Sequence, residues 1–249
     1  MFKSLARYLR RIQLVVLNRA YVHEKCEYEN MQVHWGQCAE DIIIISLLRD
    51  IHYKGFYVDV GAHHPTTFSN TYFFYRHGWS GINIDASSSS IDLFNSQRPG
   101  DTNINVGVGT TNEALEFHRF ECSLLDTFDK DMAEVWSKHS RKIRTDMVEC
   151  RTLSQILDDS LPENTDIDLL SIDVEGLELD VINSNDWGRF RPKIVVLEQL
   201  QRGSLVMQSE SAVSNLMCRH DYVCVAIAGH SQYFMRNDMY IKYMTVETA

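Results

Sequence analysis

The chain of 249 residues is poor in the residues that mark several common protein classes. It has only four prolines and twelve glycines, which excludes a collagen-like stretch and a proline-rich linker. Its six cysteines are scattered and include no C-x-x-C pair, so their spacing indicates neither a disulfide scaffold nor a cysteine-rich metal site. We therefore expect reduced thiols in a cytoplasmic protein.

Several enzyme motifs are also missing. The sequence contains no G-x-x-x-x-G-K-[ST] loop for a triphosphate, no H-E-x-x-H pair for zinc and no G-x-S-x-G turn of an α/β hydrolase. The turn after the first expected strand has one glycine, where a dinucleotide site needs three to let the backbone approach a pyrophosphate. These absences argue against nucleotide phosphates, catalytic zinc and hydrolase chemistry.

The apolar run near the N-terminus, residues 14–17, is too short for a membrane span or a signal peptide. On a helix, Phe2, Leu5 and Leu9 share one side and basic residues flank it, so residues 1–20 predict an amphipathic helix. This helix either packs on its own domain or lies on anionic lipid as a peripheral membrane contact. We predict an amphipathic helical segment over 1–34 and one domain over 35–249.

Charge is distributed unevenly along the chain. The net charge is −10, whereas residues 1–25 carry six basic groups against one acidic group, so the remaining residues carry about −15. An acidic body repels a phosphate backbone, so no nucleic acid partner is expected. The content of 44% hydrophobic and 23% charged residues is ordinary for a globular protein and excludes a mainly disordered chain.

From residue 55 onward, short apolar strands alternate with helical stretches. The expected strands are 56–61, 81–86, 103–109, 167–176 and 193–200, the helices are 69–78, 90–97 and 177–185, and a closing pair covers 222–229 and 232–237. This alternation predicts an α/β, doubly wound, mostly parallel sheet with both faces covered. The rhythm breaks at about 110–150, where a strand over LEFHRF and an irregular polar stretch over 121–145 predict a functional insert or lid.

Acidic residues end four of the five main strands. They are Asp59, Asp85, Asp173 and Glu198. In open α/β sheets, ligands bind beyond the carboxyl ends of the strands. Asp85 follows Asp59 by 26 residues, which is about the spacing of an acid that reaches the ribose hydroxyls of a nucleoside cofactor, although both residues could instead cap turns. A nucleoside without phosphates, such as S-adenosylmethionine, suits this edge best.

These residues also carry a resemblance. From about Trp35 to Glu198 the chain resembles the FkbM-type S-adenosylmethionine-dependent methyltransferases, in Gly36-Gln37 with Glu40-Asp41, in FYVDVGAHHP with FSNTY, in GWSGINIDA and in LLSIDVEGLELDVI. The last segment is the most specific. Two positions depart from the family pattern, because His63 stands where asparagine is more common and Ala86 where proline is common.

The resemblance implies a class I methyltransferase (Rossmann-like) sheet and S-adenosylmethionine as cofactor. It implies that Asp59 and Gly61 border the methionine half and that Asp85 accepts from the ribose, with Ala86 beside the adenine. The full set of expected cofactor-binding residues is Gln37, Asp41, Asp59, Gly61, Ala62, His63, Asp85, Ala86, Asn105, Val106 and Gly107.

The expected catalytic residues are Asp173, His64 and Glu175. An ordinary aspartate, with a pKa near ~3.9, is poorly matched to a hydroxyl group, so two arrangements are considered. In the favoured one, His64 accepts the proton and Asp173 orients it. In the other, Asp173 and Glu198, with or without Glu175, hold a divalent metal such as Mg²⁺ that acidifies the hydroxyl.

The leading hypothesis is O-methylation of a hydroxyl on a sugar, a glycan or a related metabolite. The alternatives are a non-catalytic scaffold with a methyltransferase fold, and a methyltransferase acting on a lipid-linked glycan at the membrane through residues 1–20. The expected partner is a small-molecule or glycan acceptor, and a homo-oligomer is a further hypothesis. The sequence does not identify the acceptor, whose recognition is expected from 110–150 and the termini.

Overall fold

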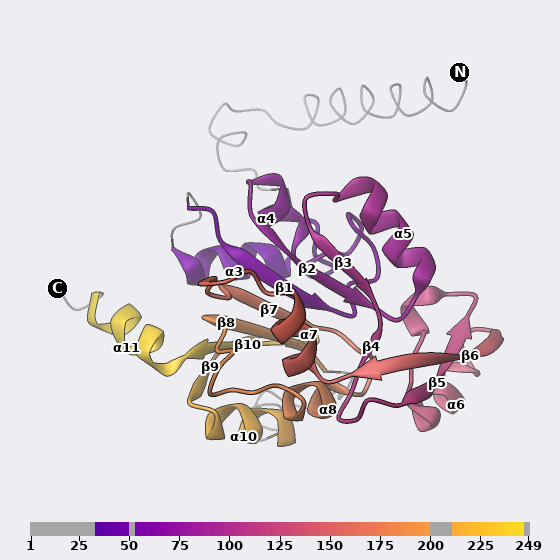
Figure 1. Cartoon of the computed structure of the whole chain (residues 1–249). Helices are drawn as coiled ribbons and strands as arrows, with labels where there is room; N and C mark the ends of the chain where they lie inside the picture. The colour runs from indigo at the N-terminus through magenta and orange to yellow at the C-terminus, as the bar shows by residue number, and fades with distance from the viewer. Residues whose placement is uncertain (1–32, 50–52, 200–210, 247–249) are drawn as a thin grey trace, which may run out of the picture. The chain divides into compact units, whose positions relative to one another are not determined.

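A seven-stranded sheet organises the chain, seen in a computed structural model that describes residues 33–49, 53–199 and 211–246 (Figure 1). The sheets and helices described all belong to one compact unit, which spans Trp35–Ala249. The amphipathic segment predicted over 1–34 lies outside the described residues except for its last two. Among the described residues, no helix has the length and apolar character that crossing a membrane requires.

The strand order of the main sheet is β3-β2-β1-β7-β8-β10-β9. Its strands are β1 (Phe56–Val60), β2 (Ser80–Asp85), β3 (Thr102–Asn105), β7 (Leu169–Ile172), β8 (Ile194–Glu198), β9 (Tyr222–Ala228) and β10 (Ser231–Arg236). All neighbours from β3 to β8 are parallel, and β10 runs antiparallel to both β8 and β9. This arrangement confirms the predicted α/β class I methyltransferase fold with an antiparallel closing strand.

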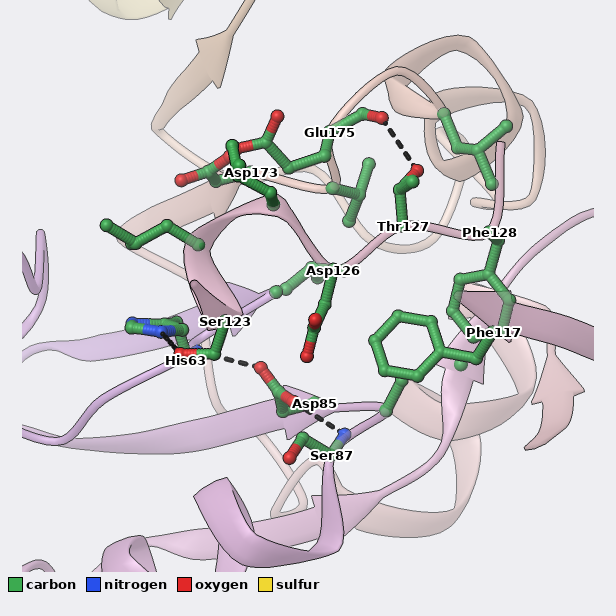
Figure 2. A pocket seen from close by; sticks show the side chains of 18 of the residues that line it. His63, Asp85, Ser87, Phe117, Ser123, Asp126, Thr127, Phe128, Asp173 and Glu175 are labelled. Atoms are coloured by element: carbon green, nitrogen blue, oxygen red, sulfur yellow. Dashed lines mark hydrogen bonds between the residues drawn. The ribbon is translucent and has the colours of Figure 1, made fainter. Parts of the chain in front are cut away.

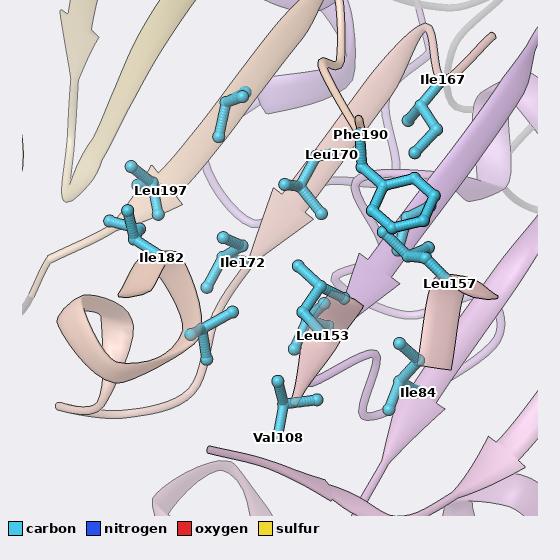
Figure 3. Close-up of a cluster of buried hydrophobic side chains, with 14 of the residues drawn as sticks. Ile84, Val108, Leu153, Leu157, Ile167, Leu170, Ile172, Ile182, Phe190 and Leu197 are labelled. Atoms are coloured by element: carbon cyan, nitrogen blue, oxygen red, sulfur yellow. The ribbon is translucent and has the colours of Figure 1, made fainter. Parts of the chain in front are cut away.

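Helices cover both faces of the sheet. The described helices are α3 (Glu40–Leu48), α4 (Tyr72–Arg76), α5 (Ser88–Gln97), α6 (Lys130–Trp136), α7 (Leu153–Ser160), α8 (Glu178–Asn183), α10 (Ala212–Arg219) and α11 (Asn237–Val246). Of these, α6 lies beside the second sheet and not on the main one (Figure 1). Side chains alternate along the central strands, so that Val58 packs with α7, α8 and α10 residues, whereas Tyr57 packs with α3 and α4 residues. Figure 3 shows part of the first of these two cores. Burial on both faces explains the continuous apolar strands.

The third predicted strand, 103–109, differs from the structure because it divides at Val106. Residues up to Asn105 pair with β2, but Gly107–Val108 form β4 in a second sheet of order β4-β6-β5. At the break, the Val106 N–H and the Asn105 side-chain amide both donate to the backbone oxygen of Asp85. The chain therefore stays attached to the end of β2 while it turns toward the second sheet.

The segment 110–150 holds more regular structure than its polar sequence indicates. It contains β5 (Ala114–Phe120), a short 3-10 turn η1 (Ser123–Leu125), helix α6 and most of β6 (Lys142–Arg151). Strands β5 and β6 pair antiparallel, and Figure 1 shows both beside α6 at one end of the unit. The irregular stretch expected over 121–145 is thus partly wrong, since the Asp129 side chain caps α6 and the paired strands flank it.

Candidate active site

A cavity of about 500 Å³ lies at the carboxyl ends of the central parallel strands. Residues that end or follow β1, β2, β7 and β8 form its floor, and residues from η1 and α6 form the opposite wall. Figure 2 shows the acidic side chains of Asp85, Asp173 and Glu175 and the aromatic side chains of Phe117 and Phe128 around this space. A cavity of this size, in the range typical of small-molecule sites, stands where ligands bind open α/β sheets.

Asp85 connects two turns at the edge of this cavity. Its carboxylate accepts a hydrogen bond from the backbone N–H of His63 at 2.8 Å and another from that of Ser87 at 2.7 Å. Burial raises the pKa of Asp85 to about 6, and the two backbone N–H groups and Arg119 oppose that rise. Since each oxygen has taken up only one N–H, the carboxylate keeps lone pairs for a ligand hydroxyl.

Gly61 allows the end of β1 to lie against the end of β7. Its φ of +77° is unfavourable for other residues, and a Cβ atom there would stand 1.7 Å from the backbone oxygen of Asp173. The Gly61 N–H donates to the backbone oxygen of Ile84 at 2.9 Å. Only glycine can therefore bring the three strand ends this close together around the cavity.

Asp59 borders a smaller cavity of about 30 Å³ that shares Gly61, Asp173 and Glu198 with the larger one. The side chain of Asp59 is almost fully buried, and its Oδ2 accepts a 2.7 Å hydrogen bond from the Thr71 hydroxyl. Burial raises the pKa of Asp59, while the Thr71 hydroxyl and the charge of Arg98 lower it. The residue is thus a buried acid that receives several hydrogen bonds.

Asp173 and Glu198 lie side by side on adjacent parallel strands. The preceding residues, Ile172 and Leu197, are register partners of β7 and β8, so both carboxyl groups reach the cavity from the same edge. Their side chains are close enough for Glu198 to influence the charge of Asp173. Burial, followed by the negative charges of Glu198 and Glu175, raises the pKa of Asp173 well above its usual range. Asp173 is thus a buried acid whose negative charge is opposed by the carboxyl groups around it.

Glu175 occupies a strained turn in the wall of the cavity. Its φ is +52°, and the turn continues through Gly176 at +113°. Burial, with the negative charges of Glu198 and Glu178, raises the pKa of Glu175 to about 8. Its Oε2 is buried and has no hydrogen-bond partner among the described residues, so this carboxyl group has capacity for a ligand.

The insert covers the cavity through specific polar contacts. The Thr127 hydroxyl donates to the backbone oxygen of Glu175 at 3.0 Å, and a 3.0 Å hydrogen bond joins Nε2 of His63 to the Ser123 hydroxyl (Figure 2). Arg119 forms a 2.8 Å ion pair with Asp126 and also donates to the Ser87 hydroxyl. These contacts fasten the insert to the turns that carry Asp85 and Glu175.

Most of the predicted site residues meet at these two cavities. The larger one is lined by Gln37, Gly61, His63, Asp85, Ala86, Val106, Gly107, Asp173, Glu175 and Glu198. The smaller one adds Asp59 and Ala62. Three predicted residues, Asp41, Asn105 and His64, line neither cavity.

The contacts of these three residues explain their positions. Asp41 is buried and accepts a 2.8 Å hydrogen bond from the backbone N–H of Trp35. The side-chain amide of Asn105 donates to the backbone oxygen of Asp85 at 2.9 Å. His64 accepts from the N–H groups of Thr66 and Thr67 through Nδ1, so the neutral ring carries its proton on Nε2 and has no free basic nitrogen. These contacts do not support the favoured arrangement, in which His64 accepts the proton, and its role stays a prediction.

Sequence reasoning missed most of the wall that the insert provides. The additional lining residues include Phe117, Leu124, Phe128, Met132 and Trp136, and the turn between β9 and β10 adds His230. No motif singles these residues out, because they are spread over a polar segment whose position depends on the pairing of β5 with β6. The metal alternative finds no support, since the described residues include no group of three or more His, Cys, Asp or Glu that could hold an ion.

Comparison with known proteins adds a family. A family model described as a methyltransferase FkbM domain matches residues 59–224, which is well over half of the chain and runs from the end of β1 to the beginning of β9. The match contains the strand ends that carry Asp59, Asp85, Asp173 and Glu198. No curated protein matches the chain.

Solved structures of methyltransferases show distant similarity. The FkbM methyltransferase of Methylobacillus flagellatus KT is 11% identical with a TM-score of 0.44, and the match covers 73% of this chain and 43% of that one. The precorrin-6y C5,15-methyltransferase of Geobacter metallireducens GS-15 is 12% identical, with a TM-score of 0.41 and coverages of 78% and 85%. A TehB-like SAM-dependent methyltransferase of Corynebacterium glutamicum is 8% identical, with a TM-score of 0.40 and coverages of 95% and 100%. The chain thus matches less than half the length of the FkbM structure.

Proposed function

The chain belongs to the FkbM methyltransferase family, and we propose that it transfers a methyl group from S-adenosylmethionine to a hydroxyl group of a sugar, a glycan or a related metabolite. The observation that carries this proposal is the cavity in which Asp85 and the Asp173–Glu198 pair line the same edge of the sheet. Asp85 is suited to accept hydrogen bonds from the ribose of the cofactor, and the Asp173–Glu198 pair is suited to accept the proton of the acceptor hydroxyl.

The cavity has the chemistry that S-adenosylmethionine requires. Apolar side chains of Ile84, Val106, Phe117 and Phe128 provide walls for the adenine ring, and Asp85 lies next to them with lone pairs for ribose hydroxyls. The close backbone approach at Gly61 and the buried Asp59 suit the methionine end. When bound, the cofactor supplies a methyl group on a sulfonium, whose leaving group is a neutral thioether.

The Asp173–Glu198 pair is the proton acceptor of this proposal. Burial and the neighbouring negative charges make the Asp173 carboxylate more basic than an exposed aspartate. A raised pKa improves the match to a hydroxyl proton at neutral pH. Glu175, with its pKa of about 8, is mostly protonated at neutral pH and can donate a hydrogen bond to the acceptor oxygen.

The lining of the cavity supports a hydroxyl-rich acceptor. Gln37, Glu175 and His230 contribute polar groups to it, while Met132 and Trp136 of α6 contribute apolar surface. Sugars combine hydroxyl edges with apolar ring faces, so they match both kinds of wall. This acceptor class is also the one that the family resemblance implies.

The decisive assay incubates the purified chain with S-adenosylmethionine and a panel of hydroxylated acceptors. We expect S-adenosylhomocysteine to form together with an O-methylated product, identified by mass spectrometry. Asp173→Asn is expected to bind the cofactor and to lose turnover by about 100-fold or more, as for removal of a general base. If the chain binds the cofactor but methylates no acceptor, the proposal is contradicted and the scaffold alternative is favoured. Methylation of nitrogen or carbon atoms only would also contradict it.

A further inference from the structure

An arginine is completely buried behind the cavity, at the end of α5. The side chain of Arg98 is 0% exposed and forms a 2.9 Å ion pair with Asp101. Its guanidinium group also lies 5.1 Å from the centre of the Tyr57 ring and 5.0 Å from that of Tyr75. A buried charge is costly unless its donors form hydrogen bonds. The remaining hydrogen bonds of Arg98 therefore indicate which residues it holds in place.

Two of those hydrogen bonds meet at Thr71, while the others go to the Tyr57 hydroxyl at 2.6 Å, the Ser69 hydroxyl and the backbone oxygen of Pro65. Both terminal nitrogens of Arg98 donate to the Thr71 hydroxyl at 3.1 Å. A hydroxyl group has a single proton, and since an arginine only donates, the Thr71 proton is free for another acceptor. That acceptor is Oδ2 of Asp59, at 2.7 Å. Arg98, Thr71 and Asp59 therefore form a chain of hydrogen bonds with one defined direction.

A second residue also favours the charge of Asp59. The Asn70 side-chain amide donates to the Ser171 hydroxyl at 3.2 Å, and Ser171, like Thr71 and Arg98, opposes the effect of burial on the pKa of Asp59. These groups together favour the ionised form of the carboxyl group. Asp59 needs this support, because Glu40, Asp173 and Glu198 line the same small cavity and burial opposes its charge.

We propose that Arg98 is a positioning residue for the cofactor, which acts through Thr71 to hold Asp59 ionised and oriented toward the cationic methionine end of S-adenosylmethionine. The inference rests on the proposed use of that cofactor. Arg98 touches no part of either cavity, so its effect on binding passes through the Thr71 hydroxyl. Cofactor affinity should then depend on a hydroxyl that has no contact with the larger cavity.

The test is a double-mutant cycle on cofactor binding. Arg98 variants alone are ambiguous, since Arg98 also supports Tyr57 and Asp101 in the core. Thr71→Val keeps the shape of the side chain and removes only the hydroxyl group that connects Arg98 to Asp59. Calorimetric titration of S-adenosylmethionine into the full chain is expected to show binding at least about tenfold weaker for Thr71→Val than for the unaltered protein. Thr71→Ser, which restores the hydroxyl, should return the affinity to within about threefold.

The same substitution in an Asp59→Asn background separates the loss of the hydrogen-bond chain to Asp59 from a change in side-chain packing. There the charge is already absent, so Thr71→Val should change the affinity by less than about twofold. Thr67→Val, an exposed neighbour in the same loop, serves as the matched control and should bind like the unaltered chain. Arg98→Lys, if it still melts cooperatively, should weaken binding non-additively with Thr71→Val.

Three results would overturn the inference. They are an unchanged affinity in Thr71→Val, an equal loss in the Asp59→Asn background, and a failure of Thr71→Ser to recover binding. Absence of binding to the unaltered chain is a different outcome, because it contradicts the proposed function itself. The control and the thermal melting curves of the variants identify any that simply fail to fold.

Discussion

The carboxylate of Asp85 accepts a 2.8 Å hydrogen bond from the backbone N–H of His63, across 22 residues of sequence. This contact joins the turn after β1 to the end of β2 and makes one continuous wall of the cavity. It also fixes the carboxylate in a buried place where its charge is costly. The acid that suits the cofactor ribose is therefore also part of the framework that shapes the site.

Cofactor binding should depend on pH through Asp85. Burial raises its pKa to about 6, and only the ionised form accepts hydrogen bonds with both oxygens. We expect the affinity for S-adenosylmethionine to rise between pH 5 and pH 7 and then to level off, as measured by calorimetry in buffers of matched ionic strength. Asp85→Asn should bind weakly at every pH and lose this rise, whereas Asp92→Asn, exposed on α5, should keep it. A rise of the same size in Asp85→Asn would assign the pH dependence to another group.

Glu175 should make the fold less stable at high pH. Its folded-state pKa of about 8 lies above the ordinary value of 4.5, so its favourable contribution is complete below pH 4.5 and is lost as the pH rises through 8. Glu175→Gln cannot ionise, and it should melt roughly 3 °C or more above the unaltered chain at pH 9 but close to it at pH 5. Glu134→Gln, exposed on α6, is the control. A melting difference that is constant with pH would contradict this role for Glu175.

Two glycines with similar backbone angles allow a matched test of the strand junction. Gly61 and Gly78 have φ values of +77° and +88°, but a Cβ would clash with the backbone oxygen of Asp173 only at Gly61. We expect Gly61→Ala to lower the free energy of unfolding by about 3 kcal/mol or more, from strain and overpacking together. Gly78→Ala should cost only about 1 kcal/mol, from the backbone angle alone. Denaturant titration gives both values, and equal losses would show that the close approach at Gly61 is unimportant.

The central strands could be predicted because they are buried on both faces and end in acids. The positions of Asp59, Asp85, Asp173 and Glu198 at one edge followed from the rule that parallel strands share their carboxyl ends. Local sequence patterns were sufficient to predict these strands, since continuous apolar strands that alternate with helices pack almost only as a parallel sheet covered on both faces.

The remainder of the site depends on contacts between distant residues. Phe117 and Trp136 reach the cavity only because β5 pairs with β6 and Thr127 bonds to Glu175, and neither contact leaves a local pattern. The surroundings of His64 could not be predicted either, because the backbone N–H groups of its own turn occupy Nδ1 only in the folded chain. Likewise, the raised pKa of Asp173 comes from burial beside Glu198 rather than from neighbours in sequence.

The N-terminal segment remains a prediction from sequence, since residues 1–20 lie outside the described part of the chain. If its basic, amphipathic pattern serves as a peripheral membrane contact, the full chain should co-sediment with vesicles containing phosphatidylserine, and less so at high salt. A chain without residues 1–20 should stay in the supernatant. Equal sedimentation of the two would contradict membrane contact through this segment.

The central claim is that S-adenosylmethionine binds at the edge of the sheet that carries Asp85. Calorimetric titration at pH 7.5 of the unaltered chain, of Asp85→Ala and of the exposed control Asp92→Ala tests it most directly. The account predicts micromolar binding to the first and third proteins, and binding at least about tenfold weaker to Asp85→Ala, which loses the ribose acceptor and leaves two backbone N–H groups without their partner. No binding to the unaltered chain, or equal affinity in all three proteins, would contradict it.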